Sequence, residues 1–147
     1  MTRPKSRVER TDEMFRPRRA ASRASTPFAF VLDELEELGP WTRPMFGCTA
    51  VYVDERIVMV LRDRPSSPHD NGVWIATTRE HHASLRRDLP GLRSIEILAG
   101  GGETGWQVIP AEHDAFEETA LRACELVRSS DPRIGKVPKA RRPRRRR

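Results

Sequence analysis

The chain has 147 residues, a formal net charge of +6 and two cysteines, a combination that favours one cytoplasmic domain in a reducing compartment. It excludes a disulfide framework, and the lack of any run near about 18 consecutive apolar residues excludes a membrane-spanning helix and membrane partner. The charge is uneven, because residues 1–24 carry net +5 and residues 131–147 net +8, which leaves net −7 for residues 25–130.

Three segments follow from this distribution. Residues 1–24 are rich in arginine, contain prolines and show no apolar period, so they are expected to form a disordered basic N-terminal arm. Residues 25–130 are expected to form one folded domain. Residues 131–147 are expected to form a disordered, arginine-rich tail.

The first predicted element is an amphipathic helix. Thr26 is a plausible N-cap, and Pro27 suits the first helical position because it has no N–H group to leave unpaired. Apolar residues then recur at helical spacing as far as Leu38. Gly39 and Pro40 are expected to end the helix.

Three strands are predicted next. Two β-branched runs, residues 49–53 and 57–61, are separated by turn-forming residues and predict a β-hairpin. The second run is apolar on both faces, so it is expected to be central in its sheet or covered on both sides. Residues 73–76 predict the third strand.

The rest of the domain reads as a helix, a second hairpin and a last helix. Thr77 and Asp114 each begin a sequence with capping-box spacing, which predicts one helix over residues 77–88 and another beyond residue 114. Residues 94–98 and 106–109 predict the hairpin between them. The order α-β(3)-α-β(2)-α predicts an α+β domain whose antiparallel sheet is covered by helices.

A short motif adds a family resemblance. The stretch RPMFG at residues 43–47, followed by Tyr52 and Asp54, resembles the N-terminal domain of the TfoX/Sxy competence-regulator family. That family opens its sheet with an Arg-x-Met-Phe-Gly-Gly segment and a tyrosine before a turn. The resemblance covers roughly residues 25–130 and implies a TfoX-N/YjbR-like fold and a non-catalytic module. The chain departs from the family at Cys48, and its arginine-rich tail stands where longer members have a second, helical domain.

The preferred interpretation of the motif is structural. Met45 and Phe46 are expected to fill the space between the first helix and the sheet, and Gly47 to adopt a backbone conformation closed to other residues. The alternative is that the motif lines a ligand groove. The residues assigned to the structural motif are Arg43, Met45, Phe46, Gly47 and Tyr52.

No catalytic, cofactor-binding or metal-binding residues are predicted. The glycine-rich loop AGGGETG, residues 99–105, precedes a strand, whereas phosphate-cradling loops precede a helix. The histidines and cysteines lack the spacing of metal ligands. A small enzyme with Cys48 as nucleophile is the least favoured hypothesis, with Arg43 as the only positive group close in sequence.

The tail carries the clearest functional indication. Its basic side chains cannot build a core, so they stay available to neutralise phosphates of DNA or RNA without sequence preference. The alternatives are a solubility tail and a tail that folds back on the acidic domain. The candidate nucleic-acid-binding residues are Lys136, Lys139, Arg141, Arg142, Arg144, Arg145, Arg146 and Arg147.

Two main functional hypotheses follow. The leading one is a non-enzymatic regulatory or protein-interaction module that binds a protein partner or a second copy of itself, with basic arms that contact nucleic acid. The second is a nucleic-acid-binding protein that acts through its arginine-rich tails.

Overall fold

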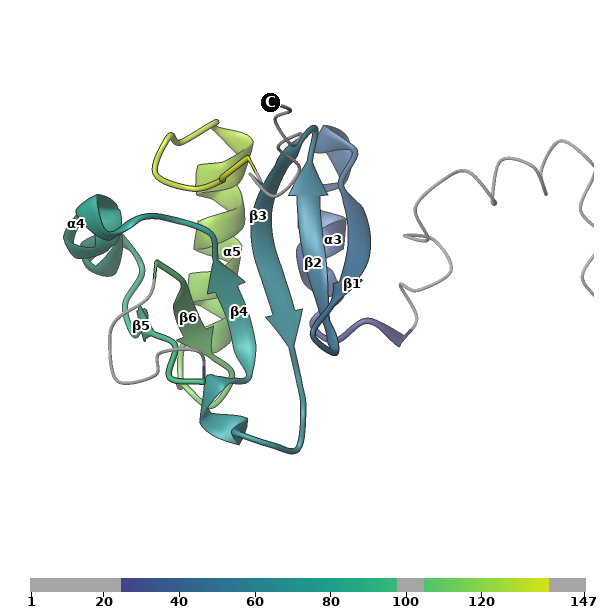
Figure 1. The fold of residues 1–147 in the computed structure, drawn as a ribbon. Coiled ribbons are helices and arrows are strands. Elements are labelled where there is room, and N and C mark those ends of the chain that lie inside the picture. Colours follow the sequence, from purple (N-terminus) through teal and green to yellow (C-terminus); the bar gives the residue numbers. More distant parts are fainter. Residues whose placement is uncertain (1–24, 98–104, 138–147) are drawn as a thin grey trace, which may run out of the picture.

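The computed structural model describes residues 25–97 and 105–137, which form an α+β domain around a six-stranded antiparallel sheet (Figure 1). The strands, in the sheet order β1-β2-β3-β4-β6-β5, are β1 (Trp41–Met45), β2 (Cys48–Val53), β3 (Arg56–Arg62), β4 (Gly72–Ile75), β6 (Gln107–Pro110) and β5 (Arg93–Ser94). The helices are α3 (Phe30–Glu34), α4 (His82–Asp88) and α5 (Phe116–Arg128), with the 3-10 helices η2 (Glu36–Leu38), η3 (Pro68–Asp70) and η4 (Arg79–His81). Within the described ranges, no helix is both long and apolar enough to cross a membrane.

The prediction of five strands is wrong, because β1 adds a sixth at the edge of the sheet. β1 contains Pro44, which pairs with Thr49 of β2 and lies next to the Met45–Cys48 pair that flanks the hairpin turn. Antiparallel pairs alternate between hydrogen-bonded and non-hydrogen-bonded positions, so the nitrogen of Pro44 points to the open edge. An edge strand tolerates proline there because no neighbouring strand needs its missing N–H group.

The predicted first helix is shorter and interrupted. Phe28 has a φ of +53°, and α3 begins only at Phe30, without a capping side chain. The expected roles of Thr26 as N-cap and Pro27 as first helical residue are therefore wrong. The rings of Phe28 and Phe30 meet the edge of Phe116 on α5, with centroids 5.1 and 6.2 Å apart. This tertiary contact replaces the regular first turn that the local pattern predicts.

Other local expectations also fail. α4 follows His81 and α5 follows Ala115, and neither helix has a side-chain hydrogen bond at its N-cap, so both predicted capping boxes are wrong. The predicted strand over residues 94–98 is reduced to the two residues of β5, and residue 98 lies outside the described ranges.

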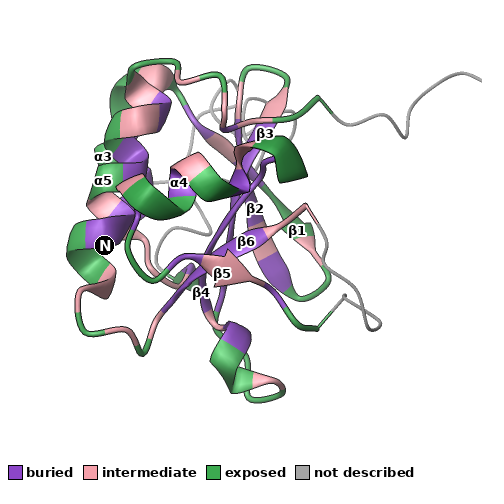
Figure 2. Ribbon diagram, turned by 90° about the vertical axis from the view of Figure 1, so that its left-hand side faces the viewer, coloured by how far each residue is buried: buried purple, intermediate pink, exposed green. Residues whose placement is uncertain are grey.

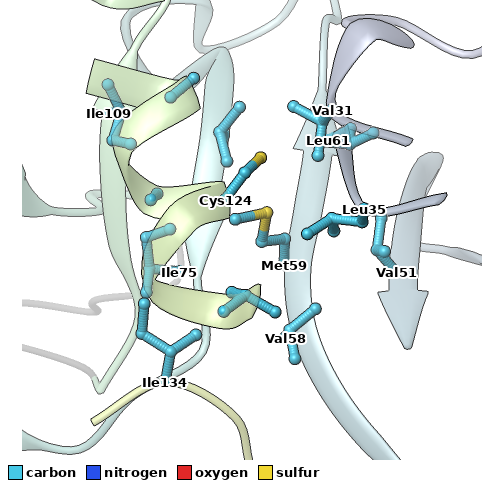
Figure 3. Packing of buried hydrophobic residues seen from close by; sticks show 14 of the residues in the cluster. Val31, Leu35, Val51, Val58, Met59, Leu61, Ile75, Ile109, Cys124 and Ile134 are labelled. Carbon is cyan, nitrogen blue, oxygen red and sulfur yellow. The ribbon is translucent and has the colours of Figure 1, made fainter. Parts of the chain in front are cut away.

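α3 and α5 lie side by side on one face of the sheet (Figure 2). The larger core cluster lies between these helices and the sheet. Met59 of β3 meets Cys124 of α5 and Leu35, the residue after α3, in its centre (Figure 3). β3 is the third of six strands, and residues 57–62 are all buried, which confirms the prediction of a central strand.

α3 and α5 lie behind the sheet in Figure 1. A second cluster of buried side chains lies on the other face of the sheet. The strand register arranges its side chains in rows that cross the sheet. The row nearest the β1–β2 turn holds Met45 and Cys48. The next row holds Arg43, Ala50, Val60 and Trp74, and the third holds Trp41, Tyr52 and Ile57.

The folded domain extends beyond residue 130, so the predicted boundary between domain and tail is too early. Ile134 is 2% exposed and belongs to the larger core cluster. Ile57 and Lys136 exchange two backbone hydrogen bonds of 2.9 and 3.0 Å, which adds the segment to the side of β3. Residues 131–137 are therefore part of the domain.

Arg133 also attaches this segment to α4. Its Nη2 donates to Asp131 Oδ2 and Asp88 Oδ2, both at 2.8 Å, and its Nη1 donates to Ser84 Oγ at 3.1 Å. Hydrogen bonding from Arg133 holds the pKa of Asp131 below its usual value, so this carboxylate stays charged at neutral pH.

Candidate functional site

The RPMFG motif forms the end of β1 and the turn into β2. Met45 pairs with Cys48, so Phe46 and Gly47 alone make the turn, with φ values of +50° and +78°. Positive φ at both central residues is what a two-residue type I′ hairpin turn requires. Phe46 is 77% exposed, so the expectation that it fills the space between the first helix and the sheet is wrong. Met45 packs against the second cluster, on the face away from α3.

Phe46 is costly for the fold. A bulky residue in the left-handed region is destabilised by roughly 1–2 kcal/mol, and asparagine or glycine is the usual residue at this turn position. Among the described residues, Phe46 is the aromatic side chain most open to solvent, and it gains no burial in return. Its presence at this turn therefore has no explanation in the stability of the domain.

Arg64 lies directly against this turn. Its Nη1 donates to the carbonyl oxygen of Gly47 at 3.3 Å, and a Cβ at residue 47 would stand 2.2 Å from that nitrogen. The guanidinium of Arg64 can therefore occupy this position because Gly47 has no side chain. No described carboxylate forms an ion pair with Arg64, although Asp63 is its neighbour in the sequence.

Arg43 is held on the same hairpin by aromatic rings. Its guanidinium carbon lies 5.6 Å from the ring centroids of both Trp41 and Tyr52. These two rings stack with centroids 4.2 Å apart and planes 12° apart. A cation–π contact of this kind contributes about 0.5–1 kcal/mol and leaves the outward donors of the guanidinium open to solvent. No described carboxylate pairs with Arg43.

Arg62 is a third guanidinium on this face, but a buried one. It is 2% exposed and donates to the carbonyl oxygens of Ser66 and Ser67 and to Asn71 Oδ1, at 2.8 to 2.9 Å. These bonds order the loop after β3. All of the acceptors are neutral, so none of them offsets the positive charge of Arg62.

Cys48 lies close to Arg62, whose charge and hydrogen bonding lower the pKa of its thiol. Burial raises the pKa of its thiol, and the charges of Arg62 and Arg64 offset this only in part. The thiol is therefore protonated at neutral pH and a weak nucleophile. Arg43, the positive group close to Cys48 in sequence, stacks over Trp41 and Tyr52, and the charges that act on the thiol are those of Arg62 and Arg64.

Acidic side chains gather on the opposite, helical side of the domain. There, Arg128 pairs with Glu34 at 2.9 Å and Arg122 pairs with Glu125 at 3.3 Å, so both arginines of α5 have carboxylate partners. Two further acids, Asp54 and Glu55, form the β2–β3 turn at the far end of β2 from Phe46. The exposed carboxylates of α3, η2 and α5 are Asp33, Glu34, Glu36, Glu37, Glu117, Glu118 and Glu125.

Lys136 is the one predicted nucleic-acid-binding residue within the described ranges. It is exposed and lies in the row that continues through Ile57 and Tyr52 to Trp41. Three strand spacings separate Lys136 from Trp41, or roughly 14 Å. The other predicted residues, Lys139, Arg141, Arg142, Arg144, Arg145, Arg146 and Arg147, lie outside the described ranges.

The remaining candidates do not converge on a site. His69 pairs with Glu96 at 2.7 Å, and His82 bonds to the carbonyl oxygen of Gly105 at 3.1 Å. In residues 25–97 and 105–137, no group of three or more His, Cys, Asp or Glu side chains could hold a metal ion. Of the AGGGETG loop only Gly105 is described.

Sequence reasoning missed Arg62 and Arg64 as members of this face. Side chains alternate between the two faces of β3, so Arg62 lies on the same face as Val60. The Arg-x-Arg pattern at the end of this strand could therefore have indicated Arg62 and Arg64.

Comparison of the chain with family models, with curated proteins and with solved structures gives no match. The resemblance to the TfoX/Sxy family therefore stays a prediction.

Proposed function

We propose that this chain is a non-enzymatic nucleic-acid-contacting module that uses the β1–β2 hairpin together with its basic segments. The observation that carries the proposal is the pair Arg43 and Arg64. Arg43 lies on β1, and Arg64, from the loop after β3, contacts the turn of the same hairpin. Neither has a described carboxylate partner, and both lie away from the acidic helices.

Electrostatics supports this assignment. Phosphate binding is driven by lysine and arginine side chains that replace condensed counterions. The net charge of −7 over residues 25–130 would repel phosphate if it were spread evenly. The exposed carboxylates of α3, η2 and α5 instead lie behind the sheet, where they do not oppose contact at the hairpin.

The C-terminal segment supports the same face. The backbone pairing of Lys136 with Ile57 fixes the place of Lys136, which shortly precedes the arginine-rich residues 138–147 in the sequence. That point lies in the same row as the Trp41–Tyr52 stack beneath Arg43. A polyanion that contacts the tail can therefore also reach the hairpin.

This proposal takes the second hypothesis from the sequence ahead of the first. The positive charges of the hairpin arginines and the basic arms are complementary to phosphate groups. No comparable charge pattern favours a protein partner for the hairpin. The protonated thiol of Cys48 argues against the alternative of an enzyme with this cysteine as nucleophile. A TfoX N-terminal-like fold remains part of the proposal, supported by the place of the RPMFG motif at the first hairpin of the sheet.

The test is DNA binding by the full chain, followed by fluorescence anisotropy over a series of salt concentrations. Arg43→Gln combined with Arg64→Gln should reduce the slope of log affinity against log salt by about 2, since each phosphate contact contributes roughly 0.9. The matched control combines Arg87→Gln on α4 with Arg122→Gln on α5, which removes the same charge from the helical side. The control should leave the slope close to that of the unaltered chain.

Three results would contradict the proposal. One is an absence of salt-dependent binding by the unaltered chain, and another is an unchanged slope in the Arg43→Gln, Arg64→Gln variant. The third is an equal loss of slope in both double variants, because net charge alone would then explain the binding.

A further inference from the structure

Phe46 has a consequence for the kind of nucleic acid that this face can bind. Its ring stands at the tip of a short turn whose two residues both have positive φ. The flanking Met45–Cys48 pair fixes the backbone on both sides of this turn. Binding the ring from outside the domain therefore costs the conformational entropy of one side chain and not that of a loop.

The surroundings of Phe46 match the chemistry of an unpaired nucleotide. Arg64 contacts the carbonyl of Gly47 beside the ring, and Arg43 lies three residues before it on β1. Proteins that bind single strands combine positive groups along the backbone with aromatic rings on which bases stack. In a duplex the faces of the bases are already stacked on one another, so an exposed ring has no equivalent partner there.

We infer that the ring of Phe46 stacks on an unpaired base, and that this face therefore prefers single-stranded over duplex nucleic acid. The inference rests on the proposed function and names its ligand more narrowly. A protein occupant has weaker support, because Arg64 contacts the neighbouring Gly47, Arg43 lies on the same hairpin, and Pro44 removes an N–H donor from the open edge of β1.

The experiment compares the full chain with three variants at residue 46, using labelled oligo(dT) and a duplex of the same length. Phe46→Asn removes the ring and supplies a residue that suits the turn, so the fold is retained. It should weaken binding to oligo(dT) by about tenfold, the effect expected for one stacked base, and leave duplex binding unchanged. Phe46→Trp should retain binding to oligo(dT), and Phe46→Leu should lose as much as Phe46→Asn.

The outcomes separate this inference from the proposed function. Equal binding by the Leu variant and the unaltered chain would overturn stacking, as would an equal loss on duplex and oligo(dT). Sedimentation velocity provides a further check, since a dimer that becomes a monomer on Phe46→Asn would place the ring in a contact between two copies. Failure of the proposed function would appear instead as an unchanged salt slope in the Arg43→Gln, Arg64→Gln variant.

Discussion

Ile57 and Lys136 pair through two backbone hydrogen bonds, so the segment that leads into the arginine-rich tail is joined to the central strand of the sheet. Next to this pair, the N–H of Gly135 donates to the carbonyl oxygen of Ala76 at 2.8 Å. The start of the tail is thus held at a defined place, and the stability of the domain depends on residues that the charge pattern assigns to the tail.

Ile134 is the first test of that dependence. Its side chain is buried against the larger core cluster, so Ile134→Ala should lower the free energy of unfolding by about 3 kcal/mol. Urea unfolding of the full chain measures this loss. Val137→Ala is the matched control, because Val137 is 63% exposed and its truncation should change stability by less than about 0.5 kcal/mol. Equal effects would contradict the assignment of this segment to the domain.

Asp70 should make the domain sensitive to acid. One oxygen of this fully buried carboxylate accepts from Arg93 Nη1 at 3.1 Å, and the other accepts the N–H groups of Glu96 and Ile97 at 2.9 and 2.7 Å. Burial alone would raise the pKa of Asp70, but these donors together outweigh it and the pKa lies below its usual value. The carboxylate therefore stabilises the fold above its unfolded pKa, and this contribution is lost as pH falls through the lower, folded pKa.

The variant Asp70→Asn checks this. At neutral pH it should lose about 3 kcal/mol of unfolding free energy, because it leaves Arg93 without its buried partner and places an amide against backbone donors. The difference from the unaltered chain should shrink as pH falls and Asp70 becomes protonated. Asp63→Asn, at an exposed position, serves as the control and should show no such convergence. A difference that stays constant with pH would disagree with this role for the charge.

The hairpin turn offers two substitutions with opposite expected signs. Phe46→Asn should raise the free energy of unfolding by about 1 kcal/mol, since asparagine adopts positive φ more readily than phenylalanine. Gly47→Ala should lower it by a similar amount, because alanine is strained at a φ of +78° and its Cβ displaces Arg64. Thermal unfolding of the two variants side by side gives both signs. A loss of stability in the Asn variant would mean that the ring of Phe46 stabilises the fold.

The thiols provide a chemical test of burial. Cys48 should react slowly with iodoacetamide at neutral pH, because burial keeps its pKa above the ordinary value. Cys124 should be slower still, since burial raises its pKa to about 12. Both rates should increase with pH and reach those of an unstructured thiol when the chain is unfolded in urea. Labelling of native Cys48 at the unfolded rate would show that the thiol is accessible and ionised.

Periodicity in the sequence predicted the parts of the fold whose residues carry their own pattern. The apolar, β-branched runs that became β2, β3 and β4 are examples, and so is the spacing of Phe116, Ala120 and Cys124 along α5. Burial on one face leaves a repeat in the sequence wherever an element is regular. The α+β class with an antiparallel sheet followed from the order of these elements, and the fold confirms it.

Only the tertiary structure decided the rest of the fold. β1 has no apolar repeat and contains Pro44, and it is a strand because β2 pairs with it on one side while its other edge is open. The first helix is interrupted because Phe28 and Phe30 meet Phe116, which is distant in sequence.

The candidate site depends on the same kind of information. The sequence located the RPMFG motif but not the exposure of Phe46, because a hydrophobic residue at a turn looks the same in sequence whether it packs or protrudes. The charged residues could be counted from the sequence, but the ion pairs that they form could not be predicted from it. Arg128 reaches Glu34 while Arg43 and Arg64 reach no described carboxylate, and these separations are set by the packing of α3 and α5 behind the sheet. Composition determines how much charge a chain carries, whereas the fold determines which charges neutralise one another and which remain free to bind a ligand.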